Sequence, residues 1–97
     1  MLSKSDINNI VISSIKEVIE KESSINIKDD FIGINASIES IDIVQIISGI
    51  EDKLASSNIE GYDLFDSVFA FDKLTFEELI DLIEKDLQLM NHDNNFR

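Results

Sequence analysis

Apolar residues recur at helical spacing in two long stretches of the chain. The stretch in the middle places five of them on one face, within a sector of about 100°: Ile43, Ile46, Ile47, Ile50 and Leu54. The stretch near the end repeats the pattern with Phe76, Leu79, Ile80, Ile83 and Leu87. The first pattern predicts a helix that starts near residues 37–40 and continues to Leu54, and the second predicts the last helix of the chain.

The last helix has a clear start signal in Thr75-Phe76-Glu77-Glu78. This is the capping-box pattern, in which the threonine hydroxyl accepts from the Glu78 amide and the Glu78 carboxylate accepts from the Thr75 amide. We expect the residues after this helix, 91–97, to form a flexible polar tail.

A further helix is predicted at the beginning of the chain. Ser3 or Ser5 can cap it, and Asp6 then lies in its first turn, where a negative charge suits the helix dipole. We expect it to end near Lys21 or Glu22. Its apolar stripe is wide, as for a helix covered by two neighbours, and comprises Ile7, Ile10, Val11, Ile15 and Val18, with Ile12 and Ile19 beside them.

Two connecting segments carry more apolar residues than solvated loops need. Residues 23–37 are predicted to be a long loop that packs on the bundle through Ile25, Ile27, Phe31, Ile32 and Ile34. Ile25 and Ile27 alternate like a strand, but no partner strand is evident, so a loop is the interpretation. Later, Asp63 or Asp66 can cap a short third helix that carries Phe65, Val68 and Phe69 inward. The aromatic residues of the segment from Tyr62 to Phe71 are interpreted as core.

Composition limits the classes of function. The 97 residues suffice for one domain with one core, and we take residues 1–97 as that domain, with the packed part at about 5–87. The net charge of −12 at pH 7 repels nucleic acid and anionic membranes and attracts basic protein surfaces, although acidic residues also simply keep a small protein soluble. The sequence contains no cysteine, no apolar run long enough to span a membrane and no signal-peptide pattern. We therefore expect a cytoplasmic, monomeric protein with no nucleic-acid or membrane partner.

Residues for catalysis are scarce. His92 is the only histidine, and we expect it to be solvated in the tail rather than to bind a metal. The chain has neither a glycine-rich phosphate loop nor an EF-hand loop. A serine hydrolase based on Ser40 would lack a general base. We therefore expect no catalytic residues, no metal site and no enzyme activity of its own.

Ser40 is the residue with the most distinctive position, because it lies at the predicted start of the second helix. One interpretation is that it caps this helix; the other is that Ser37 is the cap and Ser40, in the first turn, is free for modification. An anion attached there would meet unpaired amides and the positive end of the helix dipole. Ile41, Val44 and Ser48 lie off the apolar stripe and form a candidate docking patch beside it, although scattered surface apolar residues also occur without a function.

These residues resemble the acyl carrier protein family. Carrier proteins present Asp-Ser-Leu, then an acidic residue and a helix rich in valine and leucine; this chain has Glu39-Ser40-Ile41-Asp42-Ile43-Val44-Gln45-Ile46-Ile47. The closing helix, Leu74 to Ile83, also matches the family's pattern, and the similarity covers about residues 5 to 87. The resemblance implies an all-α, four-helix bundle of acyl-carrier type with a long first loop and a short third helix.

The resemblance also implies a function. Ser40 would carry a covalent 4′-phosphopantetheine arm, transferred from coenzyme A by a phosphopantetheinyl transferase, and the arm would hold acyl groups as thioesters in fatty acid, polyketide or related lipid biosynthesis. Acyl-transferring or condensing enzymes with basic docking surfaces would be the other partners. The residues that such partners would recognise are Glu39, Ile41, Asp42, Val44, Ser48, Glu51 and Asp52.

Three departures from the family pattern point to a specialised carrier. Glu39 replaces the usual aspartate, Ser37 stands where glycine is frequent, and the segment from Ala55 to Asp66 is longer and less acidic than usual. The alternative function is an unmodified, carrier-like interaction module in which Ser40 is only a helix cap.

Overall fold

The computed structural model describes residues 2–19, 28–36 and 38–94. In chain order its elements are α1 (Lys4–Val18), β1 (Asp30–Ile32), α2 (Ser40–Ser56), α3 (Leu64–Val68), β2 (Leu74–Thr75) and α4 (Phe76–Asn94). The described part of the chain is mostly helical, as predicted. The expectation of an all-α fold is wrong in one respect, because β1 and β2 form a small antiparallel sheet.

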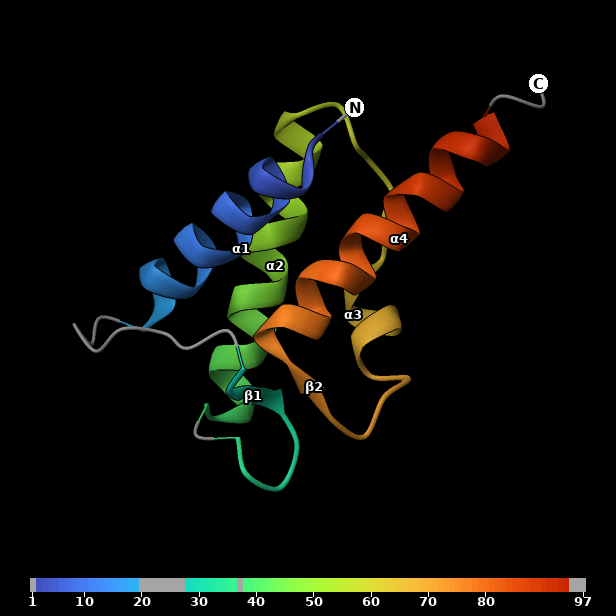
Figure 1. Ribbon diagram of the computed structural model, residues 1–97. Helices are drawn as coiled ribbons and strands as arrows, with labels where there is room; N and C mark the ends of the chain where they lie inside the picture. Colours follow the sequence, from blue (N-terminus) through green and yellow to red (C-terminus); the bar gives the residue numbers. More distant parts are fainter. Residues whose placement is uncertain (1, 20–27, 37, 95–97) are drawn as a thin grey trace.

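The three long helices enclose the core, and α1 packs against both α2 and α4 (Figure 1). The short helix α3 packs against α2, and the two strands lie at the end of the molecule where α2 and α4 begin. The helical stripes predicted from the sequence form the core. On α2 and α4, every residue of the two predicted stripes is at most 7% exposed.

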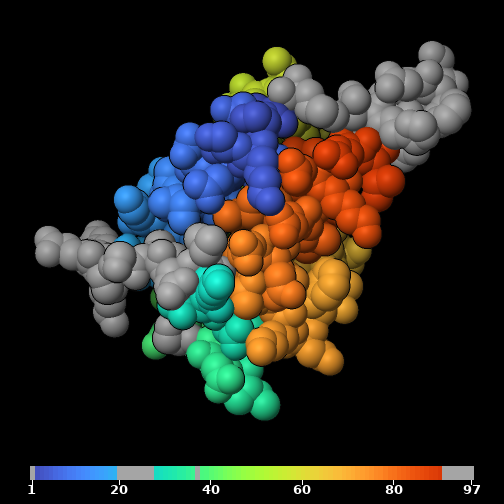
Figure 2. Space-filling model, viewed as in Figure 1, coloured from blue at the N-terminus to red at the C-terminus, as the bar shows by residue number. Residues whose placement is uncertain are grey.

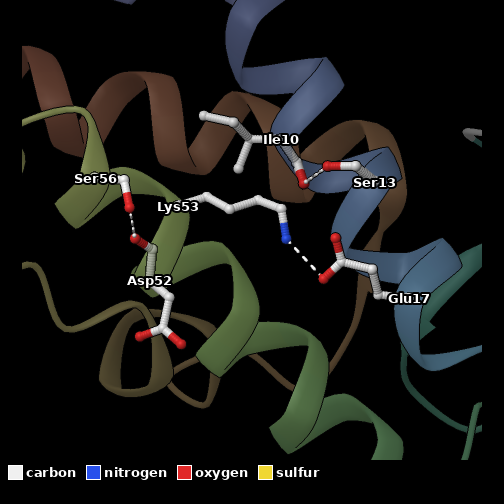
Figure 3. A network of polar contacts seen from close by, with 6 residues as sticks. All are labelled: Ile10, Ser13, Glu17, Asp52, Lys53 and Ser56. Carbon is white, nitrogen blue, oxygen red and sulfur yellow. Dashed lines mark hydrogen bonds and ion pairs between the residues drawn. The ribbon is translucent and has the colours of Figure 1, made fainter.

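Small residues face each other where α1 packs against α2. Gly49 of α2 lies opposite Ser14 of α1, and a methyl group in place of the glycine hydrogen would be 3.6 Å from the Ser14 side chain. One turn further along α2, Lys53 Nζ lies 2.8 Å from Glu17 Oε1, and this ion pair links the two helices at their surface (Figure 3). None of the helices in the described ranges combines the length and apolarity needed to cross a membrane.

The start of α1 agrees with the prediction, but its end does not. Ser3 is the N-cap, and with Asp6 it forms a reciprocal capping box, with hydrogen bonds of 3.0 and 3.1 Å. The helix ends at Val18, earlier than the expected Lys21 or Glu22, and Ile19 has extended backbone angles. The expected contacts of Ile25 and Ile27 lie outside the described residues.

The segment before α2 contains a strand that the sequence interpretation missed. Asp30 pairs with Thr75 and Ile32 with Leu74, and the Phe76 amide donates to the Asp29 carbonyl at 3.0 Å. Phe31 is fully buried between these pairs, and its ring lies 5.7 Å from that of Phe76. The partner strand was not evident because it has only two residues and leads directly into α4.

The short helix α3 turns a different face to the core than expected. Its N-cap is Asp63, one of the two predicted residues, and Leu64 and Val68 are its buried side chains. Val68 therefore points inward as predicted, whereas Phe65 and Phe69 are 46% and 49% exposed. The expectation that the aromatic residues of this segment are core is wrong for these two and for Phe71, which is 45% exposed.

The helix α4 begins as predicted and ends later. Thr75 and Glu78 form the expected capping box, with hydrogen bonds of 2.9 and 3.1 Å. The helix continues to Asn94, so the predicted polar tail is helical over residues 91–94. The remainder of that tail, 95–97, lies outside the described residues.

Candidate functional site

The candidate site is the start of α2, where Ser40 is the first helical residue. Glu39 occupies the N-cap position, with extended backbone angles (φ −71°, ψ 151°), and its side chain makes no capping hydrogen bond. Ser40 is therefore not the N-cap. The expectation that Ser37 is the cap falls on a residue outside the described ranges. The interpretation of Ser40 as a helix cap is wrong.

The first backbone amides of α2 are unsatisfied within the described part of the chain. The first helical hydrogen bond runs from the Ile43 amide to the Glu39 carbonyl, at 3.0 Å. No described residue accepts from the amides of Ser40, Ile41 or Asp42. Together with the helix dipole, these amides make the start of α2 a favourable place for a negatively charged group.

The Ser40 hydroxyl is open to solvent. The residue is exposed, and its side chain has no hydrogen-bond partner among the described residues. Its location is fixed from both sides, because Ile38 packs against the core on one side and Ile43 is buried on the other. A fixed backbone with an exposed hydroxyl suits a residue that another protein has to reach.

The apolar patch beside Ser40 has the orientation predicted from the helical spacing. Ile41 is 64% exposed and Val44 is 41% exposed, and Ser48, one turn further along, is also exposed. Ile34, in the loop that leads to α2, is completely exposed and does not pack on the bundle as expected. This loop protrudes at one end of the molecule (Figure 2).

The acidic residues predicted for partner recognition have different environments. Glu39 and Asp52 are exposed and Asp42 is partly exposed; the Asp52 carboxylate points away from α1 in Figure 3. Glu51 is half-buried, and its Oε2 accepts hydrogen bonds from the amides of Leu64, at 2.8 Å, and Phe65, at 3.4 Å. The Glu51 carboxylate therefore stabilises the start of α3.

A tyrosine that the sequence interpretation did not single out fixes the α2–α3 connection to α4. Tyr62 donates a hydrogen bond of 2.6 Å to Asp86 Oδ2. Partial burial and this hydrogen bond raise the pKa of the Tyr62 hydroxyl above its ordinary value. The neutral tyrosine is thus the form that this contact requires, and its role is structural.

Metal-binding groups and surface hollows are the other features that bear on this site. The described residues contain no cluster of histidine, cysteine, aspartate or glutamate residues suited to a metal ion. Two surface hollows, of about 330 and 490 Å³, lie at the α1–α4 surface and beside the start of α4, and Ser40 lines neither.

No protein-family model matches this chain, and neither the curated proteins nor the solved structures provide a match.

Proposed function

We propose that this protein is an acyl carrier that bears 4′-phosphopantetheine on Ser40 and is a substrate for other enzymes rather than a catalyst. The observation that carries the proposal is the start of α2, where an exposed serine hydroxyl precedes backbone amides without described partners. The resemblance of residues 39–47 to the motif of carrier proteins supplies the identity of the group.

The residues at this site fit a phosphodiester. The Ser40 oxygen would form the new bond to phosphorus and give up its proton, while the pyrophosphate bond of coenzyme A breaks and adenosine 3′,5′-bisphosphate leaves. The amides of Ile41 and Asp42 and the positive end of the α2 dipole would then favour the attached negative charge. The arm supplies a terminal thiol for thioester formation, which accords with a chain that contains no cysteine.

The partner enzymes would recognise the surface around the attachment point. Ile41 and Val44 offer apolar contact, and Glu39, Asp42 and Asp52 offer negative charge to a basic docking surface. The acyl groups would belong to fatty acid, polyketide or related lipid biosynthesis in the cytoplasm. Glu51 is the least suited of the acidic residues predicted for this contact, because α3 already engages its carboxylate.

The proposal is tested by incubating the unmodified protein with coenzyme A and a transferase of broad specificity, followed by mass spectrometry. We expect a mass gain of one phosphopantetheine group in the natural protein and none in Ser40→Ala. Ser56→Ala, which removes an exposed hydroxyl at the opposite end of α2, is the matched control and should gain the same mass as the natural protein.

Two outcomes would contradict the carrier function. A mass gain that persists in Ser40→Ala would place the modification elsewhere. No gain in correctly folded natural protein, with several transferases and with protein from its native host, would instead favour an unmodified interaction module that uses the exposed Ile41 and Val44.

A further inference from the structure

A second apolar surface lies on α3 and the turn after it. Phe65, Phe69 and Phe71 are 46%, 49% and 45% exposed, so three of the six phenylalanines of the chain are half-exposed within one short segment. We call these three residues the aromatic surface. Aromatic side chains are enriched in protein interfaces. The core does not require these three phenylalanines, because Leu64 and Val68 are the side chains that anchor α3 in it.

Two of the three rings of the aromatic surface contact each other, and the helix that carries them is anchored in the core. The rings of Phe65 and Phe69, one helical turn apart, have their centres 4.6 Å apart and are tilted by 47°. Beneath them, Leu64 and Val68 are completely buried, and the Glu51 carboxylate binds the first amides of the helix. Rings that are already ordered lose little conformational freedom when a partner binds.

The charge around this surface has one sign. Residues 60–72 contain four acidic residues and no basic one, and all four are exposed: Glu60, Asp63, Asp66 and Asp72. The first cation after them is Lys73, which lies 4.0 Å from Asp30. Exposed rings in a segment whose charged residues are all acidic complement a partner with an apolar groove and a rim of lysine or arginine. A second copy of this chain is a poor occupant, because its net charge is −12.

We propose that the aromatic surface is a docking site for a protein partner that presents an apolar groove or helix face bordered by basic residues. This site is separate from the attachment of any group to Ser40, since it requires neither the hydroxyl nor the start of α2. Binding should therefore be retained by Ser40→Ala, and failure of the carrier function would leave this proposal intact.

The experiment uses a short amphipathic peptide of leucine and lysine as the probe, with a matched peptide of leucine and glutamate as its control. Binding to isotope-labelled Ser40→Ala protein is followed by NMR at low and high salt. We expect the lysine peptide to shift the amide signals of residues 60–73 most strongly, with an affinity that falls as salt rises. The glutamate peptide should not bind.

Three variants locate the contact. Phe65→Ser with Phe69→Ser should weaken peptide binding by about tenfold or more, as expected for aromatic anchors. Asp66→Asn with Asp72→Asn should weaken it less and reduce its dependence on salt. Leu89→Ser, which changes another apolar residue that is 54% exposed, on α4, should leave the affinity within about twofold.

Unchanged affinity in either the phenylalanine or the aspartate variant, with an unaltered thermal unfolding curve, would overturn the proposal. So would shifts centred on residues 41–48, or shifts spread over the whole acidic surface. Sedimentation of the natural protein tests the other occupant: a dimer that disappears in the phenylalanine variant would show that this surface binds a second copy instead.

Discussion

The helices α2 and α4 are built alike along their length and differently at their first residues. Both bury a continuous apolar stripe in the same core. At the start of α4, the Thr75 hydroxyl accepts from the Glu78 amide and the Glu78 carboxylate accepts from the Thr75 amide. At the start of α2, Glu39 forms no side-chain capping bond.

The other two helices resemble α4 in this respect. Ser3 and Asp6 close the start of α1, and Asp63 together with Glu51 closes the start of α3. Among the four helices of the described chain, α2 alone begins without a side-chain cap. A cap is worth about 0.5–2 kcal/mol, so its omission has a cost in stability and leaves amides open for a ligand. The start of α2 is therefore the place where a bound group could reach the first helical amides without displacing a capping side chain.

The largest expected effect is a loss of stability when a buried isoleucine of α2 or α4 is shortened, which tests whether the core stabilises the two helices to the same extent. Ile47→Ala and Ile83→Ala should each lower the free energy of unfolding by about 2–5 kcal/mol, because both remove fully buried methyl groups. Val44→Ala, at a position that is 41% exposed, should cost clearly less. Urea denaturation measures all three. Equal losses at Val44 and Ile47 would mean that the orientation of α2 is wrong.

The next effect concerns the capping of α3 by the Glu51 carboxylate. Glu51→Ala should destabilise the protein by about 1.5 kcal/mol, because the carboxylate accepts from the amides of Leu64 and Phe65. Asp52→Ala removes the neighbouring, exposed carboxylate and should change the free energy of unfolding by less than about 0.5 kcal/mol. Similar values for the two variants in urea denaturation would show that Glu51 does not act as a cap.

A smaller effect compares the starts of α4 and α2 directly. Thr75→Ala should cost about 1 kcal/mol, since it removes the acceptor of the Glu78 amide. Ser40→Ala should change the free energy of unfolding by no more than about 0.5 kcal/mol, because its exposed hydroxyl has no described partner. Thermal and urea unfolding of the two variants give the comparison. A large loss in Ser40→Ala would contradict the open start of α2.

The smallest expected effect is a shift in the pKa of Asp6, which belongs to the capping box at the start of α1. Hydrogen bonds from the backbone and side chain of Ser3 lower the pKa of Asp6 below 3.8. A lowered folded-state pKa means that this contribution to stability is complete above the ordinary pKa and is lost as the pH falls through the folded value. NMR titration of the Asp6 carboxyl carbon should show the low pKa in the natural protein and a higher one in Ser3→Ala. The same value in both would disprove the capping bonds in solution.

The sequence was sufficient for the long helices because each repeats its apolar positions over several turns. Ile46, Ile50 and Ile83 could be placed in the core on spacing alone. The capping box of Thr75 and Glu78 was also predictable, since both partners lie within one turn. The same spacing placed Ile41 and Val44 outside the core, as the structure has them.

The wrong predictions concern elements that are very short and contacts between residues far apart in the sequence. A helix as short as α3 completes too few turns for spacing to choose its buried face, so Phe65 and Phe69 were assigned to the core. The bond from Leu64 to Glu51 and the pairing of Asp30 with Thr75 join separate segments, and no local pattern reveals them. At the candidate site, the exposure of Ser40 was foreseen, whereas the choice of Glu39 as the N-cap was not.

The pairing of β1 with β2 affects the order in which the protein can fold. It joins the segment just before α2 to the residues just before α4, so the approach to Ser40 is secured by a part of the chain far beyond it. Contacts between such distant segments form late, after the cost of closing the intervening loop is met. During synthesis on the ribosome, α1 and α2 can therefore associate early, while Ser40 reaches its final surroundings only once the start of α4 has emerged.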